Sequence, residues 1–354
     1  MVSEQDVLGK QMSRGEEILG EHQDMIDAEL KRVFENHNTP GRLYDMMKYH
    51  LGWLDEGLKP VEHYRGKRLR PTLCLLTYNS LSGVYDKALP AAAAVELIHN
   101  FSLIHDDIQD MDEERRHKPT VWKLWGVPQA INVGDGMHVL SNLAVLRLSE
   151  LNISGGKIAE VMRVLNNTVM ELCEGQYLDM SYEARMDITT AIYLEMISKK
   201  TAALIEAATR IGAIMATNDP ELIGHFERFG RKIGLAFQIV DDIIGIWEPA
   251  EQTGKPSGSD IRNKKKTLPV IYAFQEAGED RRKRLMEIYG GEVGEGNIEE
   301  VLNILREAKA YEYSQNMAKK LEDEALEELE KTGIENDAML KLKDLARFLV
   351  GRTY

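Results

Sequence analysis

Two pairs of adjacent aspartates interrupt apolar stretches of the sequence, and these residues are the first to suggest chemistry. Asp106 and Asp107 lie within residues 101–112 (FSLIHDDIQDMD), and Asp110 follows one helical turn after Asp106. Positions four apart share one face of a helix, so Asp106 and Asp110 can point to a single location, with Asp107 beside them. Carboxylates this close repel one another and are costly in apolar surroundings unless a cation binds them. The stretch therefore predicts a cation site.

The same pattern recurs about 135 positions later, where Asp241 and Asp242 stand within residues 237–247 (FQIVDDIIGIW). An aspartate pair is ordinarily part of a solvated helix surface, because charged residues are mostly exposed. Here apolar residues flank both pairs and leave little polar face. We interpret the two motifs as two walls of one metal site formed by Asp106, Asp107, Asp110, Asp241 and Asp242.

The donor atoms of this predicted site indicate which ion it would bind and what kind of substrate accompanies it. A set of ligands made only of oxygen atoms favours Mg²⁺ or Mn²⁺ over zinc. Magnesium usually binds through one or two carboxylates together with substrate phosphates. We therefore expect a substrate that carries phosphate.

Basic residues are clustered in three short segments, although the chain as a whole is acidic. The net charge is −14, from 44 Lys and Arg against 58 Asp and Glu, which argues against nucleic acid or an anionic membrane as a general partner. The clusters lie at residues 65–70, 115–118 and 264–266. Each could be a solvated patch in isolation. However, Pro71 suits the first turn of a helix, so residues 67–70 are expected around a helix N-terminus, where anions bind well.

The composition is that of an intracellular globular protein. The 354 residues are 43% hydrophobic, which is enough for one large core, and we expect a single domain over residues 1–354. No apolar run approaches the roughly 20 residues of a transmembrane helix. Residues 1–6 lack the pattern of a signal peptide, and Cys74 and Cys173 imply no disulfide framework, so a cytoplasmic location is expected.

Apolar residues recur at three- and four-residue spacing along most of the chain, which predicts an all-α protein without a strong strand. Helices are expected over residues 3–36, from the following loop to about 56, and over 72–82, 86–112, 137–150, 155–182, 187–216 and from about 220 through the second acidic motif. Residues 126–136 are expected to form a loop, because they contain three glycines and a proline. Residues 252–262 are also rich in Gly, Ser and Pro, and we expect a mobile loop that closes over substrate.

Taken in order, these motifs resemble those of the trans-isoprenyl diphosphate synthases (the polyprenyl synthetase family), and of its short-chain branch in particular. The matching segments are 66–71 (GKRLRP), 96–99 (ELIH), 106–110 (DDIQD) with 115–116, 200–201 (KT), 237–242 (FQIVDD) and 254–269. The resemblance implies a single large antiparallel bundle of helices around a central substrate cavity, and a homodimer. It also implies Mg²⁺-dependent, head-to-tail trans condensation of isopentenyl diphosphate with an allylic diphosphate.

The same resemblance assigns roles to individual residues. Isopentenyl diphosphate would be held by Lys67, Arg70, His99 and Arg116, with Arg68 as a less direct companion. The allylic diphosphate would be held by Arg115, Lys200, Lys255 and Lys265, with Gln176 nearby. Thr201, which can polarise the ester oxygen, and Gln238 join Lys200, Asp106 and Asp241 as catalytic residues.

The residues just before the first acidic motif indicate the length of the product. In this family, bulk at these positions stops the growing chain. Phe101 followed by the small Ser102 resembles the geranylgeranyl (twenty-carbon) pattern of the archaeal type, whereas bulky aromatic residues at both positions would have indicated farnesyl.

Two alternatives remain open beside this interpretation. A terpene cyclase or a head-to-head squalene or phytoene synthase also uses acidic motifs and magnesium, but neither needs the second diphosphate site predicted by residues 66–71 and His99. A non-catalytic or partner-dependent subunit is the other alternative, because Gly245 stands where the common second motif has a third aspartate.

Overall fold

Almost all regular structure in the chain is helical, as the spacing of apolar residues predicts. The computed structural model describes residues 13–35, 41–61, 66–183, 185–247, 258–291 and 293–351. The longer helices are α1 (Arg14–Glu35), α3 (Leu69–Ser82), α4 (Leu89–Gln109), α6 (Val127–Leu146), α7 (Gly155–Tyr182), α9 (Ala203–Ala216), α10 (Pro220–Trp247), α16 (Ala310–Lys331) and α17 (Asp337–Val350). The shorter ones are α2 (Arg42–His50), α5 (Val121–Trp125), α8 (Thr190–Ile197), α12 (Ser259–Arg262), α13 (Leu268–Glu276), α14 (Glu279–Gly290) and α15 (Glu295–Glu307).

Within the described ranges, the remaining regular elements are short turns and one small hairpin. Two 3₁₀ turns, η1 (Asp86–Ala88) and η2 (Arg147–Leu151), and one π-helical turn, η3 (Ser198–Ala202), adjoin the helices. The strands β1 (Glu114–Arg115) and β2 (Lys118–Pro119) pair antiparallel. The all-α prediction is confirmed.

Local signals in the sequence explain where several helices begin. The side chains of Ser154, Thr189 and Asn336 accept backbone N–H groups at the starts of α7, α8 and α17, as N-cap residues do. Prolines occupy the first turns of α4, α6 and α13, where the missing N–H group costs nothing. Polar caps and prolines therefore set these helix starts locally.

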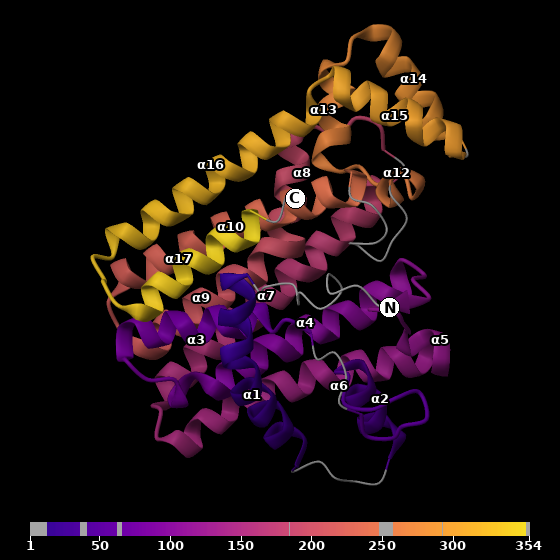
Figure 1. The fold of residues 1–354 in the computed structure, drawn as a ribbon. Coiled ribbons are helices and arrows are strands. Elements are labelled where there is room, and N and C mark those ends of the chain that lie inside the picture. The colour runs from indigo at the N-terminus through magenta and orange to yellow at the C-terminus, as the bar shows by residue number, and fades with distance from the viewer. Residues whose placement is uncertain are drawn as a thin grey trace, which may run out of the picture.

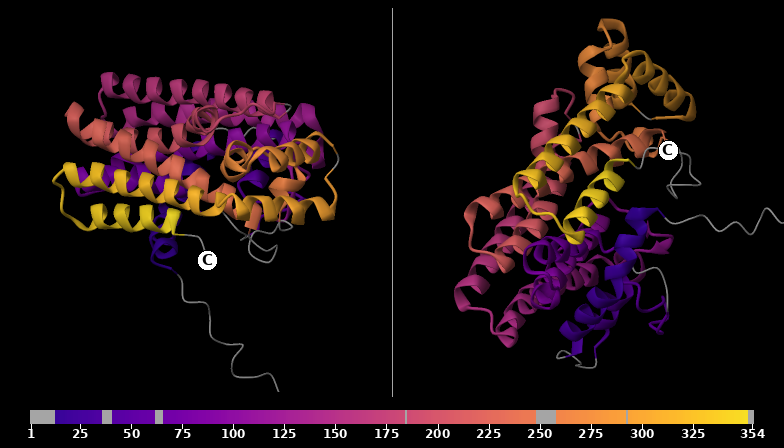
Figure 2. Two further views of the ribbon diagram at one scale, coloured as in Figure 1. Left: turned by 90° about the horizontal axis from the view of Figure 1, so that it is seen from above. Right: turned by 60° about the vertical axis from the view of Figure 1, so that its left-hand side comes forward.

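The two helices that carry the acidic motifs are held in separate parts of the core, and α3 and α9 lie between them. Helix α4 packs against α6, α3, α1 and α9, whereas α10 packs against α16, α9, η3 and α17. The long helices run roughly side by side, and α14 and α15 project beyond them at one end (Figures 1 and 2). The arrangement brings motifs far apart in the sequence into one bundle.

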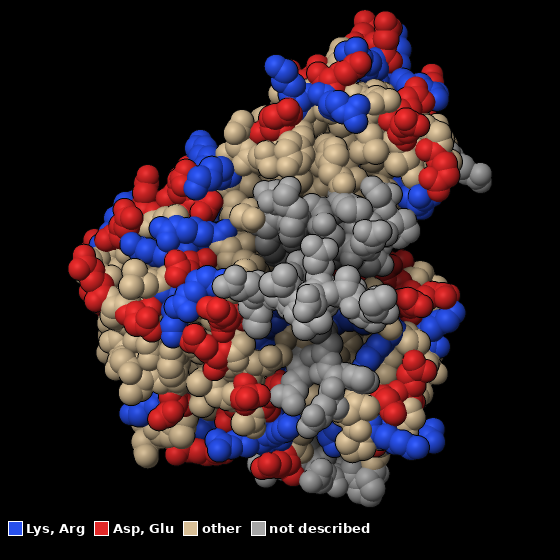
Figure 3. Space-filling view, in the orientation of Figure 1, with Lys and Arg blue, Asp and Glu red and all other residues tan. Residues whose placement is uncertain are grey.

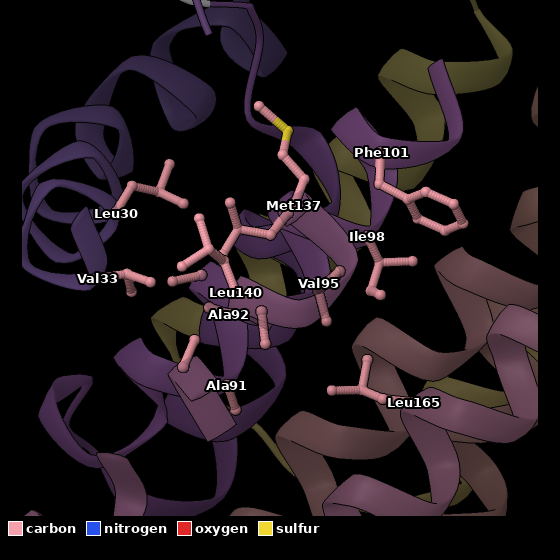
Figure 4. Close-up of a cluster of buried hydrophobic side chains, with 14 of the residues drawn as sticks. Leu30, Val33, Ala91, Ala92, Val95, Ile98, Phe101, Met137, Leu140 and Leu165 are labelled. Atoms are coloured by element: carbon pink, nitrogen blue, oxygen red, sulfur yellow. The ribbon is translucent and has the colours of Figure 1, made fainter. Parts of the chain in front are cut away.

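Small residues allow the helices around α4 to approach closely. Ala91, Ala92, Ala93 and Ala94 are all buried, and they pack among apolar side chains of α1, α6 and α7. Figure 4 shows Ala91, Ala92 and Val95 of α4 facing this cluster, with Met137 and Leu140 of α6 beside them. A second cluster is built around the fully buried Phe226 and Phe229 of α10. Both acidic helices are therefore rigidly supported.

Three predicted elements were wrong in their boundaries or continuity. The second helix ends at His50 rather than near residue 56. The expected loop over residues 126–136 is largely the first part of α6. Gly134 and Gly136 lie inside this helix. Glycine suits both positions because a Cβ atom there would collide with the side chains of His105 and Met47. The expected helix over residues 187–216 is interrupted by η3.

In the part of the chain that the structure describes, no helix is long and apolar enough to cross a membrane.

Candidate active site

The first acidic motif ends α4 and is already surrounded by cationic groups. The carboxylate of Asp106 lies 3.5 Å from Arg115 Nη2 and 3.4 Å from Lys200 Nζ. Lys200 also donates to Asp179 Oδ2 on α7, at 2.5 Å. Burial and the negative charge of Asp106 raise the pKa of Asp110. The motif is thus a cluster of negative charge that draws basic side chains from other elements.

Asp107 faces away from this cluster and into the protein. It is 1% exposed, and its Oδ1 accepts a hydrogen bond from Arg115 Nε at 2.5 Å. Burial raises its pKa to about 6, even though Arg115 favours the charged form. Arg115 thus occupies one oxygen of Asp107, whereas its Oδ2 is buried without a hydrogen-bond partner among the described residues, and metal binding by Asp107 stays a prediction.

Asp242 of the second motif is also committed to contacts within the protein. Its Oδ2 accepts the hydroxyl of the buried Tyr193 and, at 3.0 Å, the backbone N–H of Leu268, which begins α13. Its Oδ1 accepts Gln238 Nε2 at 3.0 Å. Burial raises the pKa of Asp242 to about 7, and these hydrogen bonds only partly oppose the rise. Protein donors therefore occupy both oxygens of Asp242, and its role as a metal ligand stays a prediction.

Asp106, Asp110 and Asp241 are the aspartates of the two motifs that are not buried. Among the described residues, no three Asp, Glu, His or Cys side chains converge closely enough to hold a metal ion by themselves. The oxygen donors and the raised pKa of Asp110 nevertheless suit a hard divalent cation, which would relieve the repulsion between Asp106 and Asp110. Such an ion would need further oxygen donors from a substrate.

Lys200 and Thr201 both lie on the π-helical turn η3, between α8 and α9. The hydroxyl of Thr201 donates to Gln238 Oε1 at 2.7 Å, and Gln238 in turn donates to Asp242. A single hydrogen-bonded chain therefore connects the predicted catalytic residues Thr201 and Gln238 to the start of α13. Tyr193, which anchors this chain, was missed because nothing in its sequence context distinguishes it from a core residue.

Lys265, which follows α12, comes close to the first acidic motif. Burial lowers the pKa of Lys265, but the negative charges of Asp260 and Asp110 outweigh burial and raise it. The charge of Lys200 acts on Lys265 in the opposite sense. The structure thus brings Lys200 and Lys265 together over Asp106 and Asp110. Lys255, predicted beside them, lies outside the described residues.

A second group of basic residues lines a separate cavity. Lys67, Arg70, His99 and Arg116 border it, together with Glu96 and the apolar side chains of Phe237 and Phe348. Arg70 Nη1 lies 3.3 Å from His99 Nε2. Burial and the positive charges of Arg70 and Arg116 hold the pKa of His99 well below its usual value, so His99 is neutral. The structure brings together all four residues predicted to hold isopentenyl diphosphate.

Arg68, the expected companion of these residues, borders the same cavity, and its guanidinium binds two carboxylates. It is buried, and it donates to Asp27 Oδ1 at 3.0 Å and to Glu96 Oε1 at 2.7 Å. These ion pairs join α1, the start of α3 and α4. These ion pairs stabilise the packing of the three helices, and a contact of Arg68 with isopentenyl diphosphate stays a prediction. Its left-handed backbone (φ 49°) at the N-cap of α3 turns the chain between Lys67 and Arg70.

Phe101 is packed at the junction of α4 and α6. Its ring stacks on that of His138, with centroids 5.3 Å apart, and meets the ring of His105 edge to face. Ser102 donates its hydroxyl to the backbone oxygen of His99 at 2.8 Å. His138 enlarges this aromatic barrier but was not predicted. It lies on α6, whereas Phe101 lies on α4, and nothing in the sequence indicated that the two rings meet.

Charges over the outer surface are mixed, unlike those in the site. Figure 3 shows Lys and Arg interspersed with Asp and Glu over this face, without a continuous basic area. This distribution agrees with the net charge of −14. A polyanion such as nucleic acid would require a basic surface, which the described residues do not form on this face.

Comparisons with known proteins agree with one another. The family model described as Polyprenyl synthetase matches residues 52–305. A "Short chain isoprenyl diphosphate synthase" of Methanothermobacter thermautotrophicus is 44% identical over 292 residues, covering 82% of this chain and 87% of the relative. A "(2E,6E)-farnesyl diphosphate synthase" of Mycobacterium tuberculosis is 34% identical over 339 residues, covering 95% and 92%. The crystal structure of a geranylgeranyl pyrophosphate synthetase from Pyrococcus horikoshii matches with a TM-score of 0.85 and 36% identity, covering 95% of this chain and 99% of that one.

Proposed function

Since the chain belongs to the polyprenyl synthetase family and is a trans-prenyltransferase, we propose that it condenses isopentenyl diphosphate with an allylic diphosphate to form geranylgeranyl diphosphate. The observation that carries the proposal is the presence of two separate groups of basic residues. One group, Lys200 and Lys265, lies over the first acidic motif. The other lines the cavity of Lys67 and His99.

Two diphosphate sites are what a head-to-tail condensation requires, because both substrates carry a diphosphate. A terpene cyclase has one such substrate and leaves no use for the cavity of Lys67, Arg70, His99 and Arg116. The neutral state of His99 suits a site where Arg70 and Arg116 already supply the positive charge. The geometry therefore favours a synthase with an allylic and an isopentenyl subsite.

In the proposed reaction, the carbon–oxygen bond of the allylic diphosphate breaks, and its electron pair leaves with the diphosphate. Lys200 and Lys265 oppose the negative charge that develops on this leaving group. The hydroxyl of Thr201 donates to Gln238 in this structure, so it would exchange that hydrogen bond for one to the ester oxygen when the substrate binds. When bound at Asp106, Asp110 and Asp241, Mg²⁺ would supply further neutralisation of the same charge.

The electron pair of the isopentenyl double bond then forms the new carbon–carbon bond. Lys67, Arg70, His99 and Arg116 would hold the diphosphate of that substrate and so orient its double bond. Loss of a proton to the departed diphosphate completes the step. No side chain near the site is needed as a base. The apolar rings of Phe237 and Phe348 beside this cavity help to exclude water.

The proposed chain length of twenty carbons rests on Phe101. Its ring, backed by His138, lies on α4 one to two turns before Asp106. A growing chain that starts at the diphosphate and follows α4 would meet this aromatic pair. Ser102, which is small and hydrogen-bonded to its own helix, adds no bulk. The relatives include both farnesyl and geranylgeranyl synthases, so product analysis decides between them.

We also propose that the protein is a homodimer joined through α6 and α7. These helices are neighbours, and they expose large apolar side chains at helical spacing: Val139 and Leu146 on α6, and Met170, Tyr177 and Met180 on α7. Exposed apolar surface of this kind favours association. Light scattering of the wild type and Tyr177→Glu tests this part of the proposal. The cytoplasmic location stays a prediction.

The experiment that tests the function is a product assay with radiolabelled isopentenyl diphosphate and magnesium. Dimethylallyl, geranyl and farnesyl diphosphate are supplied separately as primers, with Asp106→Asn as the inactive control. A twenty-carbon product supports the proposal. A fifteen-carbon product contradicts the role of Phe101 but preserves the chemistry. No product from folded protein with any primer would overturn the synthase and favour the non-catalytic subunit.

A further inference from the structure

The π-helical turn η3 (Ser198–Ala202) sets the direction of the residues predicted to bind the allylic diphosphate. The carbonyl oxygen of Ser198 accepts the N–H of Ala203, five residues later, instead of the usual partner four residues later. Lys200 and Thr201 lie inside this wide turn. One extra residue in a turn rotates every following side chain around the helix axis. The turn must therefore be held in place for Lys200 and Thr201 to reach the acidic motif.

Arg231 of α10 holds the first residue of the turn. Its Nη1 donates to the backbone oxygen of Ser198 at 3.0 Å and to the Ser198 hydroxyl at 2.6 Å. The backbone oxygen is the one that accepts the π-type hydrogen bond, so a charged donor supports the atom on which the turn depends. Hydrogen bonds from charged donors are roughly twice as strong as neutral ones.

Two carboxylates fix Arg231 in this position. Its Nε forms an ion pair with Glu206 on α9, and its Nη2 lies 3.3 Å from Glu171 on α7. A guanidinium has several donors in a rigid plane, so it can bind all three partners at once. Arg231 thereby joins α7, η3, α9 and α10 at one point.

Two glycines enclose the same turn from opposite helices. A Cβ atom on Gly175 of α7 would lie 2.6 Å from Lys200 Cα, and one on Gly234 of α10 would lie 2.7 Å from Ala202 Cα. Both distances are too short for real atoms, so each helix contacts the backbone of η3 directly. The turn is therefore enclosed by close packing and fastened by Arg231.

We propose that Arg231 is a positioning residue, which maintains the π-helical turn through Ser198 and so aims Lys200 and Thr201 at the allylic diphosphate. The inference rests on the proposed function. It adds a residue that belongs to neither of the groups predicted to hold the two substrates. It also predicts that loss of Arg231 affects the allylic substrate and not isopentenyl diphosphate, because Lys67, Arg70 and His99 lie in a separate cavity.

The test compares Arg231→Gln with Arg210→Gln in the full-length protein. Arg210 is the matched control, because it also joins α9 to α10, through an ion pair of 2.9 Å with Glu227, but does not touch η3. Both variants are assayed for kcat, for KM of each substrate and for melting temperature. Binding of geranyl S-thiolodiphosphate, an unreactive allylic analogue, is measured by calorimetry in the presence of Mg²⁺.

Arg231→Gln is expected to lower kcat by roughly 100-fold, the loss that a displacement of about 1 Å causes at a catalytic group. Affinity for the allylic analogue should fall at least tenfold, with KM for isopentenyl diphosphate within about twofold of wild type. Arg210→Gln should leave all three constants near wild type. Arg231→Lys should recover the melting temperature but not kcat, since lysine restores the charge without the fork of donors.

Three results would overturn the inference. The first is that Arg231→Gln changes the constants no more than Arg210→Gln. The second is an equal rise of both KM values, and the third is that activity and melting temperature recover together in Arg231→Lys. If Arg231→Gln does not fold, Arg231→Lys alone tests the inference: a recovered melting temperature with a low kcat supports it, and recovery of both overturns it. An inactive wild type would instead contradict the proposed function, so the two failures are distinguishable.

Discussion

The carboxylate of Asp260 occupies the space into which a side chain on Gly245 would extend. A Cβ atom on Gly245 would lie 2.7 Å from Asp260 Cγ and 3.2 Å from its Oδ1. The negative charge of Asp260 acts on Lys265 and on Asp242 and raises the pKa of both. The α10 side of the site therefore carries a third carboxylate, supplied from α12 instead of from the motif itself. This arrangement argues against reading Gly245 as the mark of a non-catalytic subunit.

Gly245→Asp is accordingly expected to impair the protein, although it restores the common form of the motif. The new side chain would collide with Asp260, and overpacking of this kind costs about 1–3 kcal/mol. Adding Asp260→Ala to Gly245→Asp should recover stability and most of the activity. Urea denaturation and kcat measure both effects. Gly20→Asp is the control, because no atom lies within 4 Å of a Cβ there. If Gly245→Asp alone is as stable and active as wild type, the predicted collision with Asp260 is wrong.

Gly175→Ala is expected to reduce activity sharply, because the added methyl group would strike the backbone of Lys200. The turn η3 would have to move away from α7, at a cost of about 1–3 kcal/mol in stability. Gly156→Ala, in the same helix but with open space around it, is expected to be neutral or stabilising by about 0.5–1 kcal/mol. Thermal melts and kcat report the difference. Equal behaviour of the two variants would show that η3 tolerates displacement.

The acidic motifs could be located from sequence because carboxylates in apolar helices demand a partner. The roles of their members could not. Asp107 and Asp242, the second aspartates of the two pairs, are both buried, yet Arg115 binds Asp107, whereas Tyr193 and Leu268 enclose Asp242. Such a difference depends on which element lies opposite each aspartate. Sequence spacing within one helix does not contain that information.

The interruption of a helix could not be predicted from the spacing of apolar residues either. Residues 187–216 have the apolar spacing of one continuous helix, and the π-helical turn at Ser198 leaves the pattern nearly unchanged. Gly134 and Gly136 led instead to a predicted loop where the structure has a helix. Glycine can indicate either a turn or a close contact between elements. Only the positions of His105 and Met47 decide in favour of close contact. The general fold was predictable, but its closest contacts were not.

The buried carboxylate of Glu328 predicts how stability depends on pH. Burial raises its pKa, but hydrogen bonds from His225, Lys331 and Arg228 outweigh burial and lower it to about 2 from the usual 4.5. The unfolded chain then binds a proton more readily than the folded one. The contribution of Glu328 to stability is complete above pH 4.5 and is lost as pH falls towards 2.

Glu328→Gln should therefore flatten the fall in stability between about pH 4.5 and pH 2 and lower the plateau above it. Urea midpoints measured across this range give the result. Glu324→Gln, on the same helix, should change the profile less, because Glu324 is more exposed than Glu328 and, among the described residues, forms ion pairs with Lys232 and Lys320 alone. Parallel profiles of Glu328→Gln and wild type would refute the assignment.

Phe101→Ala should lengthen the product, because it removes the aromatic ring that the growing chain is expected to meet. With that ring gone, the imidazole of His138 is the next obstacle, so Phe101→Ala with His138→Ala should extend the chain further than either change alone. Reverse-phase chromatography of the dephosphorylated products measures the lengths. Phe34→Ala is the control, since Phe34 is a buried aromatic of α1 whose ring meets that of Trp53 edge to face. It should cost about 3–5 kcal/mol of stability without altering the product. If Phe101→Ala keeps the wild-type product, the floor of the cavity lies elsewhere, and the proposed twenty-carbon product loses its structural basis.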